Sequence, residues 1–149
     1  MACTFTVILA FASFAGFAAA AEKKVRMEDL PPAVRKTVQD QTEEARIRNI
    51  IRETEKGQVR YEVESMVNGK SRDFIVDAKG ALVEVEEEVA IDSIPTPAKA
   101  AIQKKAAGGK ITRVETLTRG ASTSYEASYT TRAGKKASVG VIADGSEVK

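Results

Sequence analysis

The strongest constraint on the fold is an internal repeat, because the second half of the chain matches the first after a shift of 64 positions. The matching positions carry apolar residues, prolines and turn residues in one order, which chance rarely produces over so long a stretch. They pair Leu30-Pro31 with Ile94-Pro95, Val38-Gln39 with Ile102-Gln103, and Tyr61-Glu62 with Tyr125-Glu126. One inserted residue before Gly134 changes the shift to 65, which pairs Gly69-Lys70 with Gly134-Lys135 and Gly80 with Gly145. We therefore expect two copies of one unit, in residues 22–91 and 92–149.

Each copy opens with a short helix, predicted over residues 32–43 and 97–107. Prolines stand at both starts, where a missing backbone N–H removes no helical hydrogen bond. Apolar residues then recur at helical spacing and form one stripe on each helix. Val38 and Ile102 lie on these stripes, so both side chains are expected to pack against a sheet.

Strands follow each helix and are expected to pair as an antiparallel meander. They are predicted over residues 46–55, 58–67, 72–77 and 81–86 in the first copy, and over 110–119, 124–129 and 137–142 in the second. Asn68-Gly69 favours a tight hairpin between two of them, since both residues tolerate positive φ. The sequence thus predicts an α+β fold of two tandem helix-plus-antiparallel-meander repeats, with each helix packed on one face of a sheet.

Alternation along the second strand of each copy separates its two faces. Val59, Tyr61 and Val63 alternate with polar residues in the first copy, and Tyr125, Ala127 and Tyr129 do so in the second. Because a helix covers the apolar face, the polar face is expected to meet solvent or a partner. Its residues on these strands are Arg60, Glu62, Glu64, Ser124, Glu126 and Ser128.

An acidic run, residues 84–93, joins the two copies. Its carboxylates fall on an extended segment and are expected to spread apart rather than to wrap around a calcium ion, which needs ligands placed around a sharp turn. We therefore interpret the run as a solvated joint, assigned to the first copy.

The first 21 residues have the character of a secretory signal peptide. They carry no charged residue, are rich in Phe and Ala, and end in a run of alanines before Glu22. The usual basic residues at the start are missing, and retention as a membrane anchor is the alternative. We expect cleavage between Ala18 and Glu22, no stable membrane span afterwards, and a periplasmic or secreted protein.

Removal of this segment also restricts the chemistry. Its Cys3 is the one cysteine of the chain, and the chain contains no histidine. A mature protein without Cys or His lacks disulfides, His-assisted nucleophiles and the usual zinc ligands. We therefore expect no enzyme, no catalytic residue, no metal site and no cofactor.

Short motifs recur along the mature chain. Leu30-Pro-Pro-Ala-Val34 opens a helix, Tyr61-Glu-Val-Glu64 lies on a strand, and Asn68-Gly-Lys70 is followed by Phe74-Ile-Val-Asp77 and Gly80-Ala-Leu-Val83. These motifs resemble the PepSY-like family of small exported proteins. The second copy keeps the Ile-Pro, Tyr-Glu and Gly-Lys pairs, has Val139 in place of Phe74, and lacks most of the last strand.

The resemblance implies an extracytoplasmic binding or peptidase-inhibitory module, and some family members resemble the β-lactamase inhibitory protein in shape. The family has no catalytic residues, so none are carried over. Three classes of function stay open. One is a binding module for an unidentified extracytoplasmic protein or peptide, and another is a structural or envelope-stress protein that binds a polymer or small ligand. The third is an enzyme, which the missing His and Cys disfavour and for which only a Ser–Lys pair would be available.

Formal charge divides unevenly between the copies. Residues 22–91 carry 13 Lys and Arg against 16 Asp and Glu, whereas residues 92–149 carry 10 against 5. Arg132, Lys135 and Lys136 cluster near a predicted hairpin of the second copy and are candidates for steering an acidic partner. Nucleic acid is not expected as a partner, because no aromatic residue accompanies the cluster. The sequence does not indicate an oligomeric state.

Overall fold

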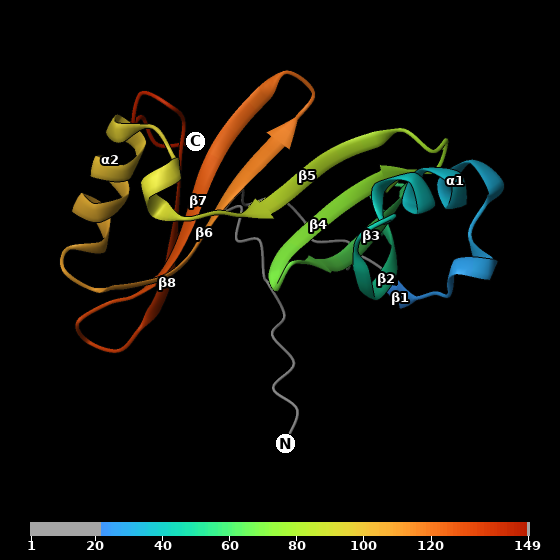
Figure 1. Cartoon of the computed structure of the whole chain (residues 1–149), viewed down its shortest axis with the longest axis horizontal. Coiled ribbons are helices and arrows are strands. Elements are labelled where there is room, and N and C mark those ends of the chain that lie inside the picture. The colour runs from blue at the N-terminus through green and yellow to red at the C-terminus, as the bar shows by residue number, and fades with distance from the viewer. Residues whose placement is uncertain (1–21, 149) are drawn as a thin grey trace.

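The computed structural model describes residues 22–148, and the predicted signal peptide lies outside this range. Within it, one antiparallel sheet of eight strands runs in strict chain order from β1 to β8. Figure 1 shows the two helices, α1 and α2, at opposite ends of this sheet. The strand register places both helices on the same face of the sheet, since the residues that contact them lie in line across the strands.

The elements have the following bounds. The strands are β1 (Lys23–Lys24), β2 (Arg46–Glu55), β3 (Gln58–Val67), β4 (Lys70–Asp77), β5 (Leu82–Glu88), β6 (Lys110–Arg119), β7 (Ser122–Thr130) and β8 (Lys136–Val141). The helices are α1 (Pro32–Gln41) and α2 (Thr96–Ala106), each preceded by a short 3-10 turn, η1 (Met27–Asp29) and η2 (Ile91–Ser93). An α+β class is therefore correct.

The strand predictions are accurate to within two residues, and the helix α1 ends two residues earlier than expected. Thr42 leaves the helical conformation directly after Gln41, with φ −121°. The Arg72 guanidinium of β4 donates hydrogen bonds to the backbone carbonyl and the side chain of Gln41, at 3.1 and 2.8 Å. These bonds satisfy acceptors that a helix end leaves open, so a sheet residue holds the end of α1.

Each helix packs over its own hydrophobic core. Val34 and Val38 of α1 meet Val63, Phe74 and Val76 of β3 and β4. Ala98, Ile102 and Ala106 of α2 meet residues of β6, β7 and β8, including Val114, Ala127 and Val141. Val38 and Ile102 have no exposed surface, which confirms their predicted facing.

The interpretation of the acidic run as a solvated joint between the halves is wrong. Residues 82–88 form β5, which pairs with β4 on one side and β6 on the other. Glu84 is buried, with 4% of its surface exposed. Glu84, Glu86 and Glu88 share one face of the sheet instead of spreading apart, because side chains on a strand alternate.

A backbone contact next to this strand recurs after 64 positions. The Val25 amide donates to the Ile50 carbonyl at 2.9 Å, and the Val89 amide donates to the Val114 carbonyl at 2.9 Å. Beside β6, the end of β5 thus takes the position that β1 takes beside β2. The same strand completes the sheet of the first half and opens that of the second.

Candidate functional site

The sheet face opposite the two helices, called the open face below, gathers many carboxyl groups together with a smaller number of arginines. Paired residues of antiparallel strands share a face, so the register determines which side chains gather there. Carboxylates come to this face from β2 through β7. They belong to Glu53, Glu62, Glu64, Asp73, Glu84, Glu86, Glu88, Glu115 and Glu126.

Apolar residues interrupt these carboxylates along the middle of the open face. Ile51, Ile75 and Leu117 lie opposite Glu62, Glu84 and Glu86 in the ladders. All three apolar side chains are half-buried. The carboxyl groups therefore stand beside hydrocarbon as well as beside one another, which disfavours their ionised form.

The β2–β3 end of the open face holds a partly buried carboxyl pair. Burial, followed by the charges of Glu53 and Glu64, raises the pKa of Glu62 to about 7. Burial likewise raises the pKa of Glu53. The Asn49 amide donates a hydrogen bond to the Glu64 carboxylate. Arg60 lies 3.8 Å from the Glu55 carboxylate at the edge of this group.

A second cluster of carboxyl groups lies where β5 pairs with β6, a boundary called the seam below. Burial raises the pKa of Glu86 to about 8, with further contributions from its hydrogen bond to Glu84 and from the charge of Glu115. Arg119 of β6 forms an ion pair with the buried Glu84 of β5. Burial also raises the pKa of Glu115, although Arg113 lies 2.6 Å from its carboxylate.

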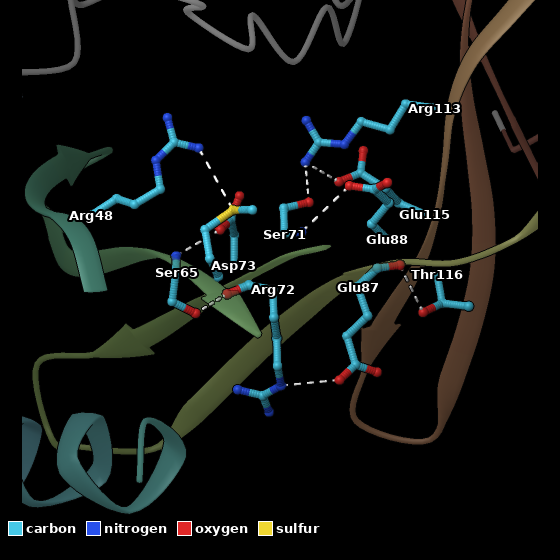
Figure 2. A network of polar contacts seen from close by, with 11 residues as sticks. Arg48, Ser65, Ser71, Arg72, Asp73, Glu87, Glu88, Arg113, Glu115 and Thr116 are labelled. Carbon is cyan, nitrogen blue, oxygen red and sulfur yellow. Dashed lines mark hydrogen bonds and ion pairs between the residues drawn. The ribbon is translucent and has the colours of Figure 1, made fainter. Parts of the chain in front are cut away.

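Figure 2 shows how the sheet separates two polar groups at this seam. On the open face, Arg113 donates a hydrogen bond to the Ser71 hydroxyl and pairs with Glu115, while the Ser65 amide donates to Asp73 at 2.9 Å. On the helix face, Arg72 binds Glu87 at 3.0 Å. Arginine thus connects β4 with β5 on the helix face and β6 with β4 on the open face. Burial also raises the pKa of Asp73.

The structure brings most, but not all, of the sequence-predicted binding residues to the open face. The set Arg60, Glu62, Glu64, Ser124, Glu126 and Ser128 lies there, half-buried, on β3 and β7. Lys136 pairs with Thr130 at the start of β8 and has a further interaction within the chain. Lys135 is exposed in the turn before it.

Arg132 lies elsewhere. A Cβ atom on Gly108, two residues after α2, would collide with its guanidinium group, so the side chain lies against the loop that follows this helix. The three basic residues near the hairpin therefore do not form one patch on the open face.

Sequence reasoning missed the centre of the open face. Glu84 and Glu86 were assigned to the joint, and Glu115 was not singled out. The signal in the sequence was the alternation of residues 84–88, in which every second residue is glutamate. Their approach to Glu115 and Glu126 depends on strand register, which one sequence does not specify.

The arrangement suits hydrogen-bond donors and cations rather than a bound metal ion. Within residues 22–148, the acidic side chains form no group of three or more that could hold a metal. Guanidinium and ammonium groups bind carboxylates through charge-assisted hydrogen bonds. None of the helices in the described part of the chain is long and apolar enough to cross a membrane.

Comparison with known proteins gives a fold rather than a family. No family model and no curated protein matches the sequence. Among solved structures, a candidate periplasmic protein from Bacteroides eggerthii matches with a TM-score of 0.65 and 12% identity, over 80% of this chain and 86% of that one. A BLIP-like protein from Bacteroides fragilis matches with a TM-score of 0.59 and 17% identity, over 80% and 84%.

A DUF2874 family protein from Bacteroides uniformis matches with a TM-score of 0.63 and 12% identity, over 80% of this chain and 86% of that one. The three matches extend over nearly the whole length of each neighbour. The chain therefore has the fold of these proteins, including the BLIP-like one.

Proposed function

We propose that this chain is an exported, non-catalytic binding module, built from two copies of one helix-and-meander unit, which contacts a protein or peptide through its open face. Export is supported by the signal-like first 21 residues and by structural neighbours that are described as candidate periplasmic proteins. The two-copy organisation is supported by the 64-residue shift and by the recurring Val25 and Val89 backbone contacts. The PepSY-like motifs agree with such a module.

One observation carries the proposal, namely the gathering of carboxyl groups on a face that no helix covers. Burial first, and then like charges on neighbouring strands, disfavour the ionised carboxylates here and raise the pKa values of Glu62 and Glu86. A partner that brings Lys or Arg side chains to this face would relieve the repulsion. We therefore propose a basic segment of a protein or peptide as the partner.

The polar character of the open face favours reversible association. Obligate interfaces are mostly apolar, whereas this face alternates carboxyl groups with single aliphatic residues such as Ile75 and Leu117. Charge complementarity of this kind acts mainly on the association rate and weakens with salt. Inhibition of a peptidase is one form that the function could take, and a peptidase assay with the identified partner would test it.

The experiment begins with capture from envelope extract and continues with the captured protein in purified form. Its affinity would be measured for the parent and for the variant Glu62→Gln, Glu86→Gln, Glu126→Gln. The matched control is Glu43→Gln with Glu44→Gln, since both glutamates are exposed in the loop before β2. We expect at least a tenfold loss and a smaller salt dependence for the open-face variant alone.

Equal losses in both variants, or none in either, would contradict the open face as the binding surface. Retention of a polysaccharide or lipid from the extract in place of a protein would favour the alternative function, a structural or envelope-stress protein.

A further inference from the structure

A second polar site lies on the helix face of the first half, away from the open face. It is a cavity of about 690 Å³ bounded by the strands β1, β2 and β3 and by the segment around η1. The residues that line it are Lys23, Lys24, Val25, Arg26, Asp29, Pro31, Arg52 and Tyr61. Four of these carry a positive charge and one carries a negative charge.

The strand register creates this excess of positive charge. Lys23 pairs with Arg52, and Arg52 pairs with Tyr61, so the three side chains lie in one row on the helix face. Like charges directly opposite each other in a ladder destabilise the pairing. Within the described residues, neither Lys23 nor Arg52 has a carboxylate within ion-pair distance.

The one carboxylate that lines the cavity is already engaged. Arg26 donates to both oxygens of Asp29, at 3.1 and 3.3 Å, and this contact lowers the pKa of Asp29. Lys23 adds a smaller contribution in the same direction. The charge of Asp29 is therefore matched by Arg26, which leaves Lys23 and Arg52 in excess on the helix face.

A tyrosine hydroxyl completes the site. Tyr61 lines the cavity although only 6% of its surface is exposed. Its hydroxyl has no hydrogen-bond partner among residues 22–148, whereas the neighbouring Arg52 donates to the Thr54 hydroxyl at 3.3 Å. A tyrosine hydroxyl next to cations that lack a carboxylate partner is a hydrogen-bond donor suited to an anion.

The second half of the molecule provides an internal comparison. The residues 64 positions after Lys23, Arg52 and Tyr61 are Glu87, Thr116 and Tyr125. These residues also pair in register, Glu87 with Thr116 and Thr116 with Tyr125. Lys24 and Arg26 correspond to Glu88 and Ala90. The tyrosine is retained while the cations around it are lost, so the positive charge is not a requirement of the fold.

We propose that this cavity binds a phosphate group, with the Arg52 guanidinium and the Lys23 ammonium group neutralising its charge and the Tyr61 hydroxyl donating a hydrogen bond to it. Arginine suits phosphate because its N–H groups match two oxygens at once. The site is independent of the open face. The phosphate could be free or could belong to a lipid headgroup or an envelope polymer.

The test uses inorganic phosphate as the probe, with the purified protein and NMR signals of the tyrosine rings as the readout. Chloride at matched ionic strength is the reference, because it separates specific binding from general screening. We expect a saturable shift of the Tyr61 signal with a Kd on the order of millimolar, since a few charged contacts suffice for that affinity. The Tyr125 signal is expected to stay unchanged.

Variants with matched controls decide which residues bind. Arg52→Gln is expected to weaken binding at least tenfold, and Tyr61→Phe several-fold. The controls are Lys56→Gln, at an exposed turn outside the cavity, and Tyr125→Phe, at the corresponding position of the second half. Melting temperatures would establish that each variant is folded, and phosphate should raise the melting temperature of the parent but not of Arg52→Gln.

A non-saturable response, or equal affinities for Arg52→Gln and Lys56→Gln, would overturn the proposal. To identify the source of the phosphate, vesicles of phosphatidylglycerol would be compared with vesicles of phosphatidylcholine. Binding of the parent, but not of Arg52→Gln, to the anionic vesicles indicates a lipid headgroup. Binding to inorganic phosphate without vesicle binding indicates a soluble ligand or a polymer. Either outcome supports the site.

Discussion

At the scale of single residues, the open face carries glutamates whose ionisation opposes folding. A carboxyl group with a raised folded-state pKa binds its proton more tightly in the folded protein than in the unfolded one. It therefore stabilises the fold at pH values below its unfolded pKa of 4.5, and this stabilisation disappears as the pH rises through the folded value, about 8 for Glu86 and about 7 for Glu62. The protein should accordingly lose stability between pH 4.5 and pH 8.

Glu86→Gln tests this directly. An amide keeps the shape of the protonated acid without the charge, so the variant should be more stable than the parent at pH 8 by roughly 1–2 kcal/mol, after allowance for partial exposure to solvent. At pH 4.5 the two should differ little. Urea unfolding at both pH values would measure the difference, with Glu43→Gln as the control. If the variant were no more stable than the parent at pH 8, ionised Glu86 would not destabilise the fold.

A second prediction at this scale concerns the core under α1. Val38 has no exposed surface and packs among apolar residues. Val38→Asp would bury a charge without a partner and should cost several kcal/mol. Gln39→Asp on the exposed side of the same helix is the control, because it carries the same charge in solvent. Thermal melting would compare them, and similar melting temperatures would contradict the facing of α1.

At the scale of elements, the turns that follow β4 and β8 each fit closely against the start of a helix. Gly80 has φ +88°, and a Cβ atom there would lie 2.8 Å from the Ala33 backbone in α1. Gly145 has φ +89°, and its Cβ would lie 2.8 Å from the Pro97 carbonyl oxygen in α2. The Thr37 hydroxyl also donates to the Gly80 carbonyl at 2.6 Å. Glycine is thus needed here for two reasons, conformation and space.

Gly80→Ala and Gly145→Ala should each destabilise the protein by roughly 2–4 kcal/mol, the sum of left-handed backbone strain and forced displacement of a helix. Gly69→Ala separates the two contributions, because Gly69 has φ +81° but no atom within 4 Å of the added Cβ. Its cost should be about 1 kcal/mol. Denaturant titrations would measure all three. Equal losses at Gly69 and Gly80 would show that the helix contact contributes nothing.

The elements also show what a sequence of this kind can and cannot predict. Strict alternation located β3 together with the polar residues Arg60, Glu62 and Glu64 on its open side. The strand β5 was predicted only in part. Residues 81–86 were expected as a strand, but the run from residue 84 onward has the composition of a solvated linker, because its glutamates occur on both faces. What stabilises it is long-range, namely pairing with β6 and the ion pair of Glu84 with Arg119. The phosphate site was missed for the same reason, since its cations meet only through the β1–β2 register.

At the scale of the whole molecule, β5 connects two cores that are otherwise separate. Val85 packs against the first core, and Val89, directly after the strand, packs against the second. Across the seam, Arg113 of β6 binds Ser71 of β4, and Arg119 binds Glu84. Loss of either half would therefore expose one side of β5 and leave the buried Glu84 or its arginine without a partner, which is costly.

The two halves should consequently unfold together. The NMR signals of Tyr61 and Tyr129 report on the first and second core, since each ring is buried in one of them. Val34→Ala removes buried methyl groups from the first core only, and Ile102→Ala does so in the second, at a cost of roughly 1–5 kcal/mol. In a denaturant titration, each substitution should lower the midpoint of both tyrosine signals by the same amount, because a two-state protein has one transition. If Val34→Ala lowered the midpoint of Tyr61 alone, each half would be an independent folding unit and β5 would serve only as a linker between them.

A shared shift would instead mean that the seam between β5 and β6 forms only when both halves are folded. A partner bound to the open face would then stabilise the entire molecule.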